Sequence, residues 1–408
     1  MNRHSKHERF TYHSELWADK AGYHMFLPAL FYYNFEAGRF PDDIQRKIGT
    51  GFRVQKETNK VISKYPIGVA VLHSPFFVMG MGIEALWPVE PELGYTTVQH
   101  KMVLLSTIFY LTLALFMLFR MLVPTYSRNK VYLLLFLLVF GSNLYFYITR
   151  DAGLSHAYSF FTFSLFYYYL ERWLNSSILR KKYLAAAVFF ASLGCLIRPS
   201  NVVFYLVVAL LFLLPHGRYI WKNRFVALKG LSVAIPIALI LPLLQLVYYK
   251  YAYGDYFTYS YTDESFIYAI KPRFARVWFA PGNGLFLYSP VFALALFGVV
   301  TAFKDKPLTS FLYLLVFFTV SYIYAAWWTP GLGCGYGHRG FIELLPIFCV
   351  PILTGISSIK PKTIKMVSGV LGFCLIVFLV YFQYRYDGCW YGNGYWDWAE
   401  IPRILNLY

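Results

Sequence analysis

Apolar runs alternate with short polar segments along most of the chain. A helix needs roughly 17 to 25 apolar residues to cross a hydrocarbon core of about 30 Å. Runs of this length predict spans at 101–123, 131–147, 157–174, 227–250, 284–303, 309–327, 341–357 and 365–384. Shorter runs at 183–197 and 201–215 flank a polar turn at 198–201 and predict two short helices, because broken backbone at membrane depth must be satisfied by protein or water. The pattern predicts an all-α polytopic membrane protein with about 10 transmembrane helices.

The composition supports a membrane protein and excludes two other classes. Hydrophobic residues make up 58% of the 408 residues, aromatic residues 21% and charged residues 14%. Soluble domains are about 25% charged, and disordered chains lack aromatic residues. A water-soluble enzyme and a disordered chain are therefore both excluded. The net charge of +17 predicts basic cytoplasmic loops before it predicts a nucleic-acid partner, and we expect no nucleic acid.

The basic residues gather at the ends of five alternate loops, which contain sixteen of them and only two acidic residues. The basic residues are Arg120, Arg128, Lys130, Arg172, Arg180, Lys181, Lys182, Arg218, Lys222, Arg224, Lys229, Lys304, Lys306, Lys360, Lys362 and Lys365. The positive-inside rule places these loops in the cytoplasm. We therefore expect a first outer region at 1–100, a membrane bundle at 101–384 with an outer loop at 251–283, and an outer tail at 385–408.

An additional apolar stretch at 67–87 precedes the first predicted span. If it crossed the membrane, every later loop would change sides. We therefore interpret it as an interfacial or re-entrant helix on the outer face, with Trp87 at the level of the lipid headgroups. An ordinary span is the alternative. Because the first hundred residues are predicted outside without a leading apolar helix, we also expect that a first span is missing from this sequence.

Ionisable residues recur in the alternate loops that are predicted to lie outside. They include Asp19, Lys64, Asp151, Arg198 and Arg339. A carboxylate can accept a proton from an attacking hydroxyl, and cations can stabilise a departing phosphate, so this combination indicates sugar transfer from a lipid-linked phosphate.

Each of these residues also has a simpler interpretation. Asp19 could be an ordinary solvated acid, and Asp151 could pair with Arg150 or cap the following helix. Arg198 could extend to the interface, and the His338-Arg339 pair could anchor a glycine-rich turn.

Six segments in order resemble multi-span glycosyltransferases of the C-type membrane fold (GT-C). They are most similar to the family 39 type, which includes protein O-mannosyltransferases and the bacterial aminoarabinose transferase acting on lipid A. The segments are Ala18-Asp19-Lys20-Ala21-Gly22-Tyr23 with Leu27-Pro28-Ala29; Lys64-Tyr65-Pro66-Ile67-Gly68; Ser155-His156-Ala157-Tyr158-Ser159-Phe160; Leu196-Ile197-Arg198-Pro199-Ser200-Asn201; Tyr253-Gly254-Asp255 with Phe279-Ala280-Pro281-Gly282-Asn283-Gly284-Leu285; and Gly337-His338-Arg339-Gly340-Phe341 with Glu343-Leu344-Leu345-Pro346.

This resemblance implies a polyprenyl-phosphate-sugar-dependent glycosyltransferase in the bacterial inner membrane, with its active site on the periplasmic side. Asp19 matches the general base of the family and Asp151 matches a second acidic residue, so the resemblance implies that both are catalytic. The implied donor-phosphate ligands are Lys64, Arg198 and Arg339, and the implied substrate contacts are Tyr65, His156 and His338. The sugar would move with inversion to an acceptor on a lipid, glycan or protein.

The sequence also allows predictions about cofactors, a disulfide and alternative functions. An Asp-x-Asp motif is absent beside Asp19, so we expect no required cofactor, and no motif supports a divalent metal. Cys334 and Cys389 both fall in predicted outer segments, where an oxidising compartment would allow a disulfide. A transporter or flippase for a lipid-linked sugar is the alternative function, and a structural subunit of an envelope complex is a third.

Overall fold

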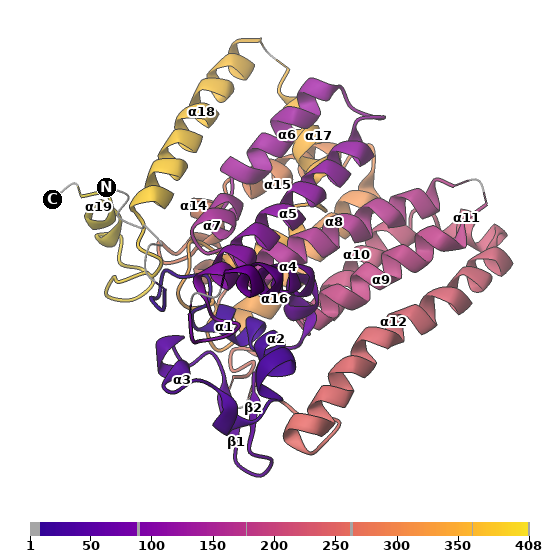
Figure 1. The fold of residues 1–408 in the computed structure, drawn as a ribbon. Helices are drawn as coiled ribbons and strands as arrows, with labels where there is room; N and C mark the ends of the chain where they lie inside the picture. Colours follow the sequence, from indigo (N-terminus) through magenta and orange to yellow (C-terminus); the bar gives the residue numbers. More distant parts are fainter. Residues whose placement is uncertain (1–8, 88–89, 177, 262–263, 361, 407–408) are drawn as a thin grey trace. The chain divides into compact units, whose positions relative to one another are not determined.

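The computed structural model describes residues 9–87, 90–176, 178–261, 264–360 and 362–406, and this part is predominantly helical (Figure 1). The chain divides into two compact units. The first comprises Met1–Ala114, Tyr147–Val202 and Phe225–Asp263, and the second comprises Leu115–Phe146, Val203–Arg224 and Glu264–Tyr408.

The first unit combines short elements near the N-terminus with long helices. The elements are α1 (Asp19–His24), α2 (Phe26–Pro28), the π-helix η1 (Ala29–Tyr33), the 3-10 helix η2 (Ala37–Arg39), α3 (Ile44–Lys47), β1 (Arg53–Gln55), β2 (Lys60–Ile62), α4 (Gly68–Leu86), most of α5 (Thr97–Leu122), α8 (Ser155–Leu174), α9 (Lys181–Ile197) and α12 (Arg224–Tyr253). Strands β1 and β2 pair antiparallel, with Val54 opposite Val61. Leu16, Met25 and Phe77 lie in the core beneath α1, each at most 1% exposed. This core holds the N-terminal elements against the long helices.

The second unit contains α6 (Arg128–Phe140), most of α10 (Asn201–Leu213), α11 (Gly217–Lys222), α13 (Phe274–Phe279), α14 (Leu285–Tyr288), α15 (Val291–Ala302), α16 (Pro307–Ala326), the 3-10 helix η3 (Arg339–Leu344), α17 (Cys349–Ser358), α18 (Lys362–Arg385) and α19 (Glu400–Ile404). Helix α7 (Leu144–Thr149) runs across the boundary between the units. Helix α15 packs along α17, as α8 packs along α9 in the first unit (Figure 1).

In the part of the chain that the structure describes, five helices are long and apolar enough to cross a membrane, namely α4, α5, α12, α16 and α18. Helix α18 has a mean hydropathy of 2.3 in its most apolar window, and only 6% of that window is buried. Such an apolar surface requires lipid rather than water around it. The expectation of a helical, multi-pass membrane protein is confirmed. Since α4 also meets the length and hydropathy required of a span, the interfacial position of 67–87 stays a prediction.

Three predicted spans are interrupted. Residues 131–147 divide into α6 and α7 at Asn143, whose backbone amide donates to Ser289 Oγ and whose Nδ2 donates to the Tyr336 carbonyl, each at 3.1 Å. Residues 284–303 divide into α14 and α15 before Pro290, which lacks a backbone N–H.

Residues 341–357 begin as the 3-10 helix η3 and continue as α17 only after Pro346. The predicted pair of short helices is confirmed as α9 and α10. Helix α9 ends at Ile197 because the next residue, Arg198, precedes a proline and takes an extended conformation.

Candidate functional site

Helix α1 begins at Asp19, the predicted general base. The side chain is half-buried, and its carboxylate accepts a hydrogen bond from the Tyr65 hydroxyl. Gly22 lets α1 approach this tyrosine, because a Cβ there would lie 2.8 Å from the Tyr65 ring and 2.5 Å from the Gly51 carbonyl oxygen. The Asp19 carboxylate therefore has a protein partner in addition to solvent.

Aromatic rings lie next to Tyr65, the hydrogen-bond partner of Asp19. Tyr65 is 7% exposed, and its ring centroid lies 4.2 Å from that of Tyr23. The Lys64 ammonium lies 5.2 Å from the Tyr65 ring centroid and 5.9 Å from that of Tyr261, within cation–π range. Burial, followed by the charge of Asp19, raises the pKa of Tyr65 well above its ordinary value. Tyr65 therefore stays protonated at neutral pH and keeps donating to Asp19.

The other face of α1 contacts the segment before α8. Lys20 Nζ lies 2.8 Å from Asp151 Oδ1, and the Lys20 side chain is only 5% exposed. One turn later on the same face, the Tyr23 hydroxyl donates to Ser155 Oγ at 3.1 Å. Asp151 therefore has an ion-pair partner 131 residues away in sequence.

The end of α9 is fixed against α8 by two side chains of the predicted polar turn. Arg198 Nη1 donates to His156 Nε2 at 2.8 Å, which requires a neutral imidazole at this nitrogen. Asn201 Nδ2 donates to Ser159 Oγ at 3.2 Å, one helical turn further along α8. Arg198 is half-buried and directed toward α8, so it does not simply extend into solvent.

A close helix crossing joins these contacts into one cluster. A Cβ on Gly68, the first residue of α4, would lie 2.4 Å from the backbone nitrogen of Ile197, so only glycine lets α4 approach the end of α9 here. We call the resulting group the α1 cluster; its members are Asp19, Lys20, Lys64, Tyr65, Asp151, His156 and Arg198. It brings together six of the eight predicted site residues, from segments up to 179 positions apart in sequence.

The remaining two predicted residues, His338 and Arg339, belong to the second unit. His338 is fully buried, and its Nε2 donates to the Pro330 carbonyl at 2.8 Å. This hydrogen bond anchors the glycine-rich turn, in agreement with the simpler interpretation of His338. Arg339 is half-buried at the start of η3, and Glu343 in the same 3-10 helix is fully buried.

The glycine-rich turn is also held covalently. A disulfide joins Cys334 to Cys389, which confirms the expected link between this turn and the tail. The Tyr386 hydroxyl donates to the Gly335 carbonyl at 3.0 Å beside it.

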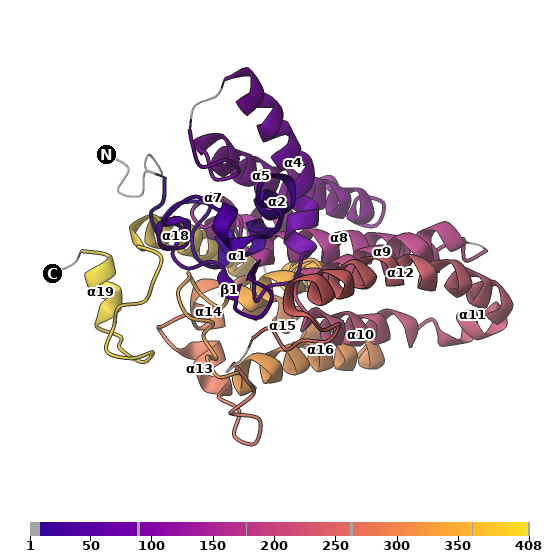
Figure 2. The same ribbon diagram turned by 60° about the horizontal axis from the view of Figure 1, so that its bottom comes forward.

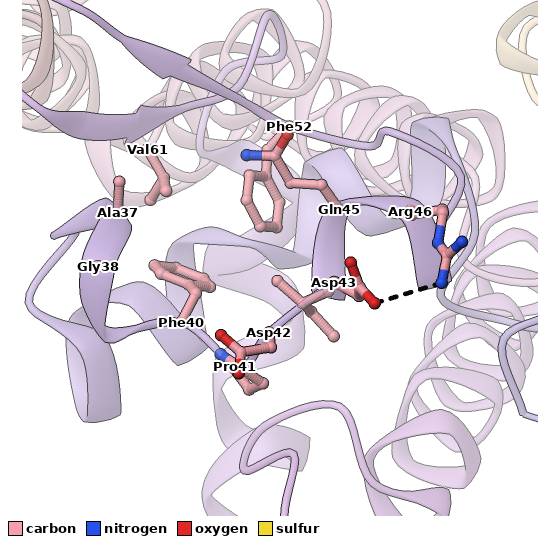
Figure 3. Close-up of a pocket in the computed structure, with 11 residues that line it drawn as sticks. Ala37, Gly38, Phe40, Pro41, Asp42, Asp43, Gln45, Arg46, Phe52 and Val61 are labelled. Carbon is pink, nitrogen blue, oxygen red and sulfur yellow. Dashed lines mark hydrogen bonds and ion pairs between the residues drawn. The ribbon is translucent and has the colours of Figure 1, made fainter.

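A separate pocket of about 370 Å³ lies among the N-terminal elements of the first unit (Figure 3). Phe40, Phe52 and Val61 give it an apolar wall, and Asp43 and Arg46 form an ion pair at 3.2 Å beside it. None of the eight predicted site residues lines this pocket.

Two aspects of the chemistry complete the description. Among the residues that the structure describes, no group of three or more His, Cys, Asp or Glu side chains could hold a metal ion. No sequence signal identified the contacts of Lys20, Tyr23 and Tyr261, although the first two residues lie in the segment that resembles the family. The α1 cluster contains two hydrogen-bonded carboxylates and three cations. A carboxylate can accept a proton from a hydroxyl, and cations can bind a phosphate.

Comparison with solved structures finds similarity to the apo crystal structure of ArnT from Cupriavidus metallidurans. The TM-score is 0.46 and the sequence identity 10%, over 79% of this chain and 59% of that chain. The chain thus corresponds to about three-fifths of the length of that protein. No protein-family model matches the chain, and no curated protein matches its sequence.

Proposed function

We propose that the protein is a membrane glycosyltransferase that moves a sugar from a polyprenyl-phosphate donor to an acceptor hydroxyl or phosphate on the periplasmic face, with inversion. The observation that carries this proposal is the placement of the Asp19 carboxylate, hydrogen-bonded to Tyr65, in the same cluster as the Lys64 ammonium. A base for the acceptor and a cation for the donor phosphate are the two groups that such a transfer needs.

Asp19 acts on the acceptor. Its carboxylate takes the proton of the acceptor hydroxyl while that oxygen attacks the anomeric carbon from the face opposite the phosphate. The bond between the anomeric carbon and the phosphate oxygen breaks, and polyprenyl phosphate leaves with the electron pair. Tyr65 contributes by orienting the carboxylate, because its own hydroxyl remains protonated.

Lys64 and Arg198 bind the donor phosphate. Lys64 is half-buried between two aromatic rings, and Arg198 is held at the end of α9 by His156. Charge on the leaving phosphate grows as the bond breaks, so positioned cations stabilise the transition state more than the ground state. Asp151 holds Lys20 in place, and we propose that Arg339 in the second unit supplies a further phosphate contact, with His338 contacting the substrate.

The test is transfer in proteoliposomes with polyprenyl-phosphate donors that carry different isotope-labelled sugars, and with an envelope extract as the source of acceptors. The proposal expects labelled sugar on a new product, free polyprenyl phosphate in equal amount, and inverted configuration at the anomeric carbon. A flippase would move the intact donor across the bilayer without releasing polyprenyl phosphate. That result, or a product with retained configuration, would overturn the proposal.

A further inference from the structure

Large apolar side chains on the loop 265–273, just before α13, are exposed. Ile270 is 94% exposed, Ile267 61% and Phe266 49%. Figure 2 shows the chain before α13 projecting beyond that helix. Apolar side chains are more stable when removed from water, so the exposure of Ile267 and Ile270 is unfavourable and indicates that something covers them.

Backbone hydrogen bonds fix this loop at one end of α16. The amides of Tyr268 and Arg273 donate to the carbonyls of Ala326 and Ala325, each at 3.0 Å, and the Trp328 amide donates to the Ser265 carbonyl at 3.0 Å. The loop is therefore attached to the helix end at both of its ends.

That end of α16 lies at membrane-interface depth. Helix α16 is apolar enough to span the bilayer, and it ends at Ala326, directly before Trp327 and Trp328. Paired tryptophans at the end of a span are typical of the headgroup level. The end of a span lies at an interface on either side of the membrane, so this depth does not depend on the predicted orientation.

The charges next to the exposed isoleucines favour a lipid surface. Lys271 and Arg273 are both exposed and follow Ile270 closely, and the segment 265–279 contains no acidic residue. The Arg273 guanidinium lies 3.8 Å from the Tyr268 ring centroid, which holds it beside the loop. Lys and Arg side chains near an anionic bilayer are attracted to its surface.

We propose that the loop 265–273 is a membrane anchor, which inserts Ile267 and Ile270 into the boundary between headgroups and acyl chains of an anionic leaflet. Lys271 and Arg273 would contact lipid phosphates there. Peripheral segments bind to bilayers by inserting apolar side chains below the lipid headgroups and placing cations at the level of the phosphates. The anchor is independent of the proposed sugar transfer.

The test places an environment-sensitive fluorophore on the loop through Ile270→Cys, in a background in which Cys195, Cys349 and Cys374 are replaced by alanine and the disulfide is kept. Lys56→Cys, on the exposed turn between β1 and β2, is the matched control. The protein is reconstituted in phosphatidylcholine vesicles with about 30% phosphatidylglycerol and spin-labelled lipid, an anionic surface.

The proposal expects blue-shifted emission at position 270 and quenching by spin-labelled lipid about twofold or more stronger than at position 56. Adding Lys271→Gln and Arg273→Gln should weaken this quenching in vesicles that contain phosphatidylglycerol and leave it unchanged in pure phosphatidylcholine. Water-like emission at position 270 would overturn the anchor. Blue-shifted emission without lipid quenching would also overturn it and would point to a protein partner.

Discussion

Removing the ammonium of Lys20 should destabilise the first unit strongly. The Lys20 side chain is 5% exposed and that of Asp151 24%, and their charged atoms lie 2.8 Å apart. Methionine has a similar length and no charge, so Lys20→Met fills the same space. The Asp151 carboxylate then stays partly shielded from water and loses the ion pair with Lys20.

The exposure of the two groups sets the size of the effect. Breaking a buried ion pair by removing one partner costs about 3 to 5 kcal/mol. Because a quarter of Asp151 reaches solvent, water recovers part of its hydration, and we expect a loss of about 2 to 3 kcal/mol. Lys47→Met is the control: Lys47 is 39% exposed, and its partner Glu92 also contacts Arg9, so the loss should stay below about 1 kcal/mol.

A double-mutant cycle measures the pair directly. The free energy of unfolding in detergent is compared for the native protein, Lys20→Met, Asp151→Asn and the double variant. A coupling energy of about 1.5 kcal/mol or more is expected, because each single variant breaks the same Lys20–Asp151 ion pair. If Lys20→Met were as stable as Lys47→Met and the coupling near zero, the argument that this pair fixes α1 would be refuted.

Three further predictions concern stability. Burial lowers the pKa of His24 to about 4 from an unfolded value of 6.5. The free energy of unfolding should therefore fall by roughly 3 kcal/mol as the pH drops from 6.5 to 4. If the melting temperature of His24→Gln kept the pH dependence of the native protein, this prediction would be contradicted. Gly68→Ala should lower the free energy of unfolding by about 1 to 3 kcal/mol, because the added Cβ forces α4 away from the α9 backbone. Gly82→Ala in the same helix should not destabilise the protein, because the space around Gly82 is open. Equal melting temperatures of the two variants would refute the close crossing. Replacing Cys334 and Cys389 by alanine should cost about 4 kcal/mol for a 55-residue loop, and free thiols in unreduced native protein would exclude the disulfide.

The membrane-spanning helices were predictable because a span requires a long apolar run, which is a local property of sequence. The predicted run 101–123 lies within α5 except for its last residue, and 365–384 lies within α18. The interruptions at Asn143 and before Pro290 could not be seen from average hydrophobicity alone, although proline gives a local signal. The interruption at Asn143 depends on a hydrogen bond to the Tyr336 carbonyl, which is 193 residues away. The sequence alone does not identify that partner.

The chemistry of the candidate site was predictable, but its pairings were not. Carboxylates and cations in alternate loops indicated which residue types gather, and six of the eight lie in the α1 cluster. The sequence did not identify Lys20 as an ion-pair partner of Asp151, which the structure shows. This ion pair depends on how α1 packs against the segment that precedes α8. The residues next to Lys20 in sequence do not indicate that its side chain is only 5% exposed.

The most direct test of the proposed function compares polyprenyl phosphate released by the native protein with that released by Asp19→Asn and Asp42→Asn. Asp42 is an exposed acid of the same N-terminal region, so its variant controls for loss of charge alone. The proposal predicts that Asp19→Asn lowers the release rate by about 100-fold or more, because a general base is lost, and that Asp42→Asn keeps the native rate. Native release by Asp19→Asn in folded protein would contradict the assignment of Asp19 as the base.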